Sequence, residues 1–110
     1  MVVRPCTRAD FVAFYGKEPP MTLRALVAER DDRIVGIGGY YIQNGFAIAF
    51  TDSVDVITRR DIVTAGREFM KFLGKLKVEV VAQCNPAIGD TALRHFGFRP
   101  YHDDAWRLVK

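Results

Sequence analysis

Two aspartates in one strand-like stretch are the best candidates for proton transfer. Asp52 and Asp55 lie three residues apart in a segment that reads as a strand from 46 to 56. A carboxylate held beside a reacting group can act as a general base. Residues three apart on a regular strand point to opposite faces, so only one of the two can face a given cleft. The alternative is that both lie on a solvated face or bind nearby backbone N–H groups.

Two adjacent arginines at the start of a predicted helix are candidates for binding phosphate. Thr58 and Asp61 have the spacing of a helix N-cap, so the helix begins near Arg59 and Arg60. Free N–H groups and the helix dipole favour anions at such an end, and an arginine can bind phosphate oxygens through two parallel hydrogen bonds. The alternative is an ordinary capped amphipathic helix that packs on a sheet.

The elements around these residues alternate between strands and helices. Thr7 and Asp10 have capping spacing, and Gly16 is suited to a left-handed helix end. Asn44-Gly45 is a strong signal for a two-residue hairpin turn, and a polar Asp-Asp pair precedes the middle strand. The predicted segments, in chain order, are strand 2–3, helix 8–15, strands 23–29, 33–43 and 46–56, helix 58–74, strand 78–84, helix 90–96 and strand 105–109. This order, β-α-β-β-β-α-β-α-β, predicts an α/β domain of the α+β kind with a mixed sheet.

Three glycines interrupt the middle strand. Gly36, Gly38 and Gly39 do not resemble a phosphate-binding loop, because no helix follows them. Glycine inside a strand more often marks a bulge or a place where another backbone or a ligand comes close. We therefore expect a bulge or a close approach at this part of the sheet.

Size and composition limit the classes of function. The chain has 110 residues, 49% of them hydrophobic, and a net charge of +3 with both signs interspersed, so we expect one domain over residues 1–110. The dense basic runs of many nucleic-acid-binding proteins are missing, and no apolar run approaches the roughly 18–20 residues that cross a bilayer. The two cysteines and two histidines lack metal-ligand spacing. These features predict a cytoplasmic protein without membrane, nucleic-acid or metal partners.

Several motifs follow one another in the order of a known superfamily. Arg4-Pro5 and the segment 7–10 come first, Val54-Asp55-Val56 ends the third strand of the meander, and Asn85 follows the next strand. Gly97-Phe98 then closes the last helix. With these motifs the chain resembles, over nearly its whole length, a compact member of the GNAT superfamily of acyl-CoA N-acyltransferases. The resemblance implies a GNAT-like fold whose fourth and fifth strands are parallel and splay apart.

The resemblance also implies an activity and a set of site residues. The activity is direct transfer of an acyl group from acyl-CoA, with acetyl-CoA as the expected donor, to an unidentified amine within a ternary complex. Tyr101 and His102, expected in a loop after the last helix, are candidates to reach inward as the acid. The other implied roles are backbone contacts to CoA from Val54 and Val56, pyrophosphate binding by Arg59 and Arg60, shaping of the acceptor side or thiol end by Asn85, and base catalysis by Asp52 or Asp55.

Two positions depart from the pattern of that superfamily. Typical members have a glycine three residues after the arginine of the pyrophosphate turn, where this chain has Val63. Many members also have a tyrosine four residues before the Gly-Phe glycine, where it protonates the leaving thiolate, and here that residue is Leu93. The alternative to an enzyme is therefore a catalytically inactive GNAT-like interaction or structural protein. Compact proteins of this style resemble some encoded by bacteriophages, which makes a virion-associated, homodimeric or otherwise assembled form the second expectation.

Overall fold

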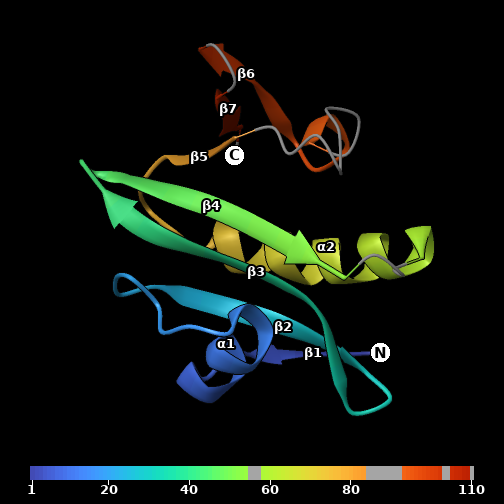
Figure 1. Ribbon diagram of the computed structural model, residues 1–110. Helices are drawn as coiled ribbons and strands as arrows, with labels where there is room; N and C mark the ends of the chain where they lie inside the picture. Colours follow the sequence, from blue (N-terminus) through green and yellow to red (C-terminus); the bar gives the residue numbers. More distant parts are fainter. Residues whose placement is uncertain (55–57, 84–92, 103–104, 110) are drawn as a thin grey trace.

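A computed structural model describes residues 1–54, 58–83, 93–102 and 105–109 (Figure 1). These residues form an α+β domain around a mixed seven-stranded sheet in the order β1-β2-β3-β4-β5-β7-β6. The elements are β1 Val2–Pro5, α1 Arg8–Tyr15, β2 Arg24–Arg30, β3 Arg33–Gln43, β4 Phe46–Ser53, α2 Arg59–Gly74, β5 Val80–Gln83, β6 Phe98–His102 and β7 Ala105–Leu108. The mixed sheet and its α+β character agree with the sequence prediction.

Strands β2, β3 and β4 form the predicted antiparallel meander of three strands, and β1 pairs antiparallel with β2. Asp31 and Asp32 connect β2 to β3 with φ angles of 53° and 61°, and Asn44 and Gly45 connect β3 to β4 with 52° and 83°. Two successive positive φ angles define the turn whose twist suits a two-residue hairpin. Aspartate, asparagine and glycine tolerate this conformation best, so the residue types in the two turns determine where the strands reverse.

Both predicted helix starts are confirmed. Thr7 Oγ1 accepts the N–H of Asp10, and the Asp10 carboxylate accepts the N–H of Thr7, which completes a capping box on α1. Gly16 ends this helix at a φ of 74°. Thr58 Oγ1 likewise accepts the N–H of Asp61 at the start of α2, at a distance of 3.1 Å.

The strand β6 differs from the prediction, which placed Tyr101 and His102 in a loop. The chain turns at Gly97, whose φ is 93°, and continues directly into β6, which pairs antiparallel with β7. Phe98 is buried as the first residue of this strand. Pro100 interrupts the strand pattern in the sequence, but β6 is at the edge of the sheet, where a missing N–H is tolerated. Asp90, the predicted cap of the preceding helix, lies outside the described residues, whereas residues 93–95 are helical.

The helices α1 and α2 lie over opposite faces of the sheet (Figure 1), and each packs with one hydrophobic cluster. On one face, Phe11 of α1 packs with three buried strand residues, Ala25, Val27 and Ile37. On the other face, Leu73 of α2 packs against the second half of the sheet, where the buried residues are Ala47, Ala49, Val80, Ala82, Phe98, Trp106 and Leu108. The two helices therefore stabilise different halves of one sheet from different sides.

The glycines of β3 lie where other groups come close, as the sequence predicts. The register between β2 and β3 shifts at Ala28, opposite Gly36, which is the irregularity of a bulge. A Cβ on Gly38 would lie 3.2 Å from the Phe69 ring of α2, whereas a Cβ on Gly39 would lie 2.5 Å from the carbonyl oxygen of Arg24. Successive residues of β3 thus face α2 and the α1 side in turn.

Gly39→Ala is expected to lower the free energy of unfolding by roughly 1–3 kcal/mol, because the new methyl group overlaps the backbone of β2. Gly36→Ala is the matched control on the same strand, since its Cβ would meet its nearest atoms at 3.6 and 4.0 Å. The control should be neutral, or more stable by up to about 1 kcal/mol, because alanine restricts the unfolded chain. Urea unfolding of both variants measures the difference, and equal stabilities would contradict the close approach.

Candidate functional site

An open cavity of about 720 Å³ passes between the sheet, α2 and the segment 93–98. It lies where β4 extends past its neighbour β5, to which it is parallel. The two strands are paired from Ala47 to Ala49 on β4 and from Val80 to Ala82 on β5. A volume of this size is within the roughly 300–1,000 Å³ of small-molecule sites. We take this cavity, called the cleft below, as the candidate site.

The edge of β4 offers backbone groups to the cleft. The N–H of Val54 donates to Val35 O of β3 at 3.0 Å, and the N–H of Ala47 donates to Glu79 O on the opposite side at 2.9 Å. Because backbone direction alternates along an antiparallel strand, the N–H and C=O groups of Thr51 and Ser53 point away from β3. Both residues line the cleft beyond the last described pair of β4 with β5. Backbone groups at a strand edge can pair with an extended ligand.

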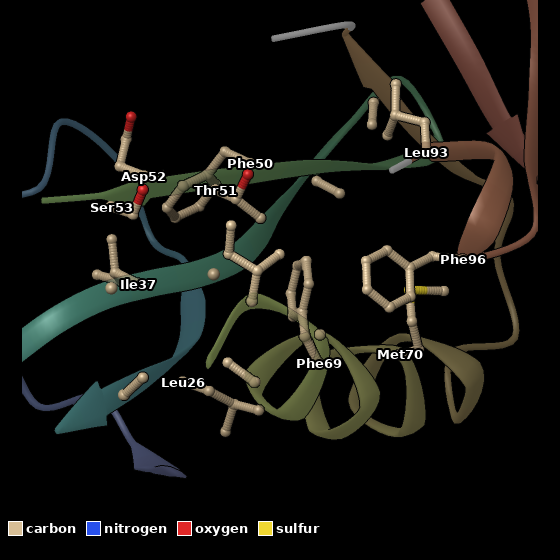
Figure 2. Close-up of a pocket in the computed structure, with 18 of the residues that line it drawn as sticks. Leu26, Ile37, Phe50, Thr51, Asp52, Ser53, Phe69, Met70, Leu93 and Phe96 are labelled. Carbon is tan, nitrogen blue, oxygen red and sulfur yellow. The ribbon is translucent and has the colours of Figure 1, made fainter. Parts of the chain in front are cut away.

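Large apolar side chains form most of the remaining wall (Figure 2). Phe50 comes from β4, Phe69 and Met70 from α2, and Leu93 and Phe96 from the segment before β6. Phe96 lies directly against α2, because a Cβ on Gly66 would be only 2.2 Å from its ring. The wall therefore favours an apolar ligand or the apolar part of a larger one.

A tyrosine and an aspartate from distant parts of the chain meet at one end of the cleft. Tyr15, the last residue of α1, donates its hydroxyl to Asp52 Oδ2 of β4. Asp52 lines the cleft, and its side chain is drawn in Figure 2. Burial raises the pKa of the Tyr15 phenol above its usual range, and the hydrogen bond to the Asp52 carboxylate raises it further. Tyr15 is therefore a neutral hydrogen-bond donor at neutral pH.

A nearly buried carboxylate fixes the N-terminal end of α2. Asp61 is only 6% exposed and forms an ion pair with Arg30, the last residue of β2. The ion pair joins the start of α2 to the end of β2. The positive charge of Arg30 lies against the negative charge of Asp61 in the first helical turn. Arg59 and Arg60 in the same turn are exposed. The end of the helix therefore carries an outward-facing positive charge, which favours an anion.

The predicted site residues differ in how the structure places them. Asp52 lines the cleft and Val54 follows it at the end of β4, with its N–H already bonded to β3. Arg59 and Arg60 lie one turn before Ile62, which lines the cleft. Asp55, Val56 and Asn85 lie outside the described residues. Tyr101 lies in β6 and not in a loop.

Sequence reasoning missed two parts of the site. The sequence interpretation treated Tyr15 only as an apolar residue of its helix. Its spacing of four from Phe11 places the two side chains together on the side of α1 that faces the sheet. The backbone edge at Thr51 and Ser53 was missed because it depends on which side of β4 pairs with β3, and this register is not visible in the pattern alone.

Comparison with known proteins does not assign this chain to a family. No model of a protein family, no curated protein and no solved structure matches this chain. Within the described ranges, no group of three or more histidine, cysteine, aspartate or glutamate residues is arranged to hold a metal ion. In that same part of the chain, no helix has both the length and the apolar character needed to cross a membrane.

Tyr15→Phe is expected to lower the free energy of unfolding by about 0.5–1 kcal/mol at pH 7, because the variant loses the hydrogen bond to Asp52. The pKa of Tyr15 is raised on folding, so its stabilisation is fully present below the unfolded value of about 10 and is lost as the pH rises above that value. The difference between wild type and variant in urea unfolding should therefore shrink from pH 7 to pH 11. An equal difference at both pH values would contradict this role.

Proposed function

We propose that the chain is an acyl-CoA-dependent N-acyltransferase with a GNAT-like fold. The observation that carries the proposal is the parallel pair β4 and β5, whose last described pair is Ala49 with Ala82, while β4 runs on to Ser53 along a large cleft. The crossover helix α2 starts from the same end of β4. This combination brings the edge of β4, an apolar cavity and a helix N-terminus to one place, which suits an extended thioester that ends in phosphates.

The pantetheine arm of acyl-CoA would bind along β4. Its amide groups would pair with the N–H and C=O groups of Thr51 and Ser53 in the manner of an added strand. Val54 and Val56, which the resemblance also implies, follow directly along the same path. Main-chain pairing of this kind would fix the depth of the thioester in the cleft without any charged side chain.

The pyrophosphate would bind at the start of α2. Arg59 and Arg60 are exposed there and can bind phosphate oxygens through charged hydrogen bonds. Asp61 lies in the same turn, but its carboxylate is turned inward to Arg30 and away from an incoming anion. The ion pair thus supports the site by placing a counter-charge beside the one acidic group in the first turn.

The reaction would be a direct transfer in a ternary complex. The amine nitrogen attacks the thioester carbonyl carbon, the C–N bond forms, and the C–S bond breaks as the tetrahedral intermediate collapses. The proton lost by the amine would go to Asp52, a residue that lines the cleft and whose carboxylate is held by Tyr15 on the face that carries α1. The CoA thiolate leaves and takes a proton, for which Tyr101 stays the candidate donor.

One observation favours the second candidate, a GNAT-like domain without catalysis. Leu93 is half-buried in the wall of the cleft where many superfamily members have a tyrosine as acid. A domain of this kind would keep the fold and act as an interaction or structural protein. Binding of acyl-CoA distinguishes the two candidates, because a protein that has lost the activity has no need of a CoA site.

Isothermal titration with acetyl-CoA tests the proposal directly. The wild type should bind, and Arg60→Ala should weaken binding by roughly 1.5–3 kcal/mol if Arg60 makes a charged hydrogen bond to the pyrophosphate. Arg67→Ala, an exposed arginine further along the same helix, is the matched control and should bind like the wild type. A folded wild type that gives no heat with millimolar acetyl-CoA would rule out the enzyme and leave the second candidate.

Asp52→Asn is expected to lower kcat/KM by about 10²-fold, because the variant cannot accept the proton of the amine. Its affinity for acetyl-CoA should not change. The assay measures release of the CoA thiol with a panel of primary amines, and Glu68→Gln, an exposed carboxylate on α2, serves as the control. An unchanged rate in Asp52→Asn would remove this residue from the proton path.

A further inference from the structure

The cleft as a whole, at about 720 Å³, is larger than an acetyl group requires, and one part of it lies beneath α2. The sheet side of this part includes Leu26, Gly36 and Gly38, and the helix side includes Ile62, Ala65 and Phe69. We call these six residues and the space between them the chamber. It is continuous with the β4 edge at Thr51 and Ser53, where the thioester would lie.

Local structure explains why the chamber is not filled by the protein. Leu73 anchors α2 at one end by complete burial, and the ion pair of Asp61 with Arg30 fixes the other end. Between these anchors Ile62, Ala65 and Phe69 are only partly buried. The sheet opposite them has no side chain at Gly36, where an added Cβ would have its nearest neighbours at 3.6 and 4.0 Å. The helix is thus held at its ends, Phe69 rests on Gly38, where a Cβ would lie 3.2 Å from its ring, and the remaining space lies beside this contact along Gly36, Ile62 and Ala65.

The chemistry of the chamber excludes a polar occupant. Among the described residues that line the cleft, the polar side chains are all on β3 and β4, namely Tyr41, Gln43, Thr51, Asp52 and Ser53. The helix side consists of Ile62, Ala65, Gly66, Phe69 and Met70, which offer no hydrogen-bonding side chain. A polar group placed here would lose its hydrogen bonds to water without replacement, whereas an alkyl chain gains from burial.

We infer that the chamber binds the acyl chain of the donor, so that a medium-chain acyl-CoA is the preferred donor over acetyl-CoA. This inference rests on the proposed function, and it identifies the class of substrate for the same site. The thioester would lie beside Thr51 and Ser53, and the chain would extend beneath α2 toward Phe69 (Figure 2). The transfer itself is unchanged: the acyl carbon exchanges its bond to sulfur for a bond to nitrogen, whatever the length of its chain.

A chain-length series tests the inference on the intact protein. Isothermal titration compares free CoA with its acetyl, butyryl, hexanoyl and octanoyl thioesters. Affinity should rise by roughly fourfold for each CH₂ that becomes buried, until the chamber is full. If hexanoyl-CoA binds no more tightly than acetyl-CoA, the inference that the chamber binds the acyl chain is wrong, while the proposed function stands. If none of the thioesters binds, both the proposed function and the assignment of the chamber to the acyl chain are wrong.

Substitutions that fill the chamber, each compared with a matched control, test the inference further. Ala65→Phe should remove the dependence of affinity on chain length among the acyl thioesters. Thr64→Phe is the control, because it adds the same ring at the neighbouring exposed position of α2. Gly36→Val is a second filling variant from the sheet side, where a Cβ meets only ordinary contacts and a β-branched residue suits a strand. Circular dichroism selects the folded variants, and a folded filling variant that keeps the full chain-length dependence would overturn the assignment.

Discussion

The parallel pairing of β4 with β5 is the constraint on which the rest of the structure depends. Two parallel neighbours cannot be joined by a hairpin, so the chain must cross from the end of β4 back to the start of β5. The helix α2 makes this crossing, and its first turn therefore lies at the end of β4, beyond the last described pair of that strand with β5. The cleft, the strand edge and the positive helix end are three results of one topological requirement.

Because successive residues of a strand point to opposite faces, the side chains of the proposed site lie on both faces of the sheet. Asp52 points to the face that carries α1, where Tyr15 holds its carboxylate. Thr51 and Ser53 point their side chains to the face that carries α2, beside the chamber. In the proposed reaction the amine and its base would approach from one face and the chain of the donor would lie on the other. Two substrates can then meet at the thioester without competing for the same space.

Local signals predicted much of this fold, and long-range pairing accounts for what they missed. Capping residues such as Thr7 and Thr58, and turn residues such as Asn44, act within a few positions, so their effect can be inferred from the sequence alone. The edge strand β6 was missed because Pro100 breaks the local pattern, although pairing with β7 stabilises it. The contact between Tyr15 and Asp52 joins residues 37 positions apart. The chamber could not be predicted from the sequence either, because a cavity depends on the distance between two packed elements.

The two outer strands of the described sheet have a feature in common that bears on pairing with a further strand. The N–H of Cys6 donates to Ala25 O, and the N–H of Val109 donates to Gly97 O, which fixes the alternation of backbone groups in β1 and β6. By that alternation the ring nitrogens of Pro5 and Pro100 are directed outward, at opposite edges of the sheet. A nitrogen without hydrogen cannot donate to a further strand, so each edge lacks a donor where a second chain would have to pair. A further strand added at either of these described edges would therefore leave one of its carbonyl groups without a partner at the proline.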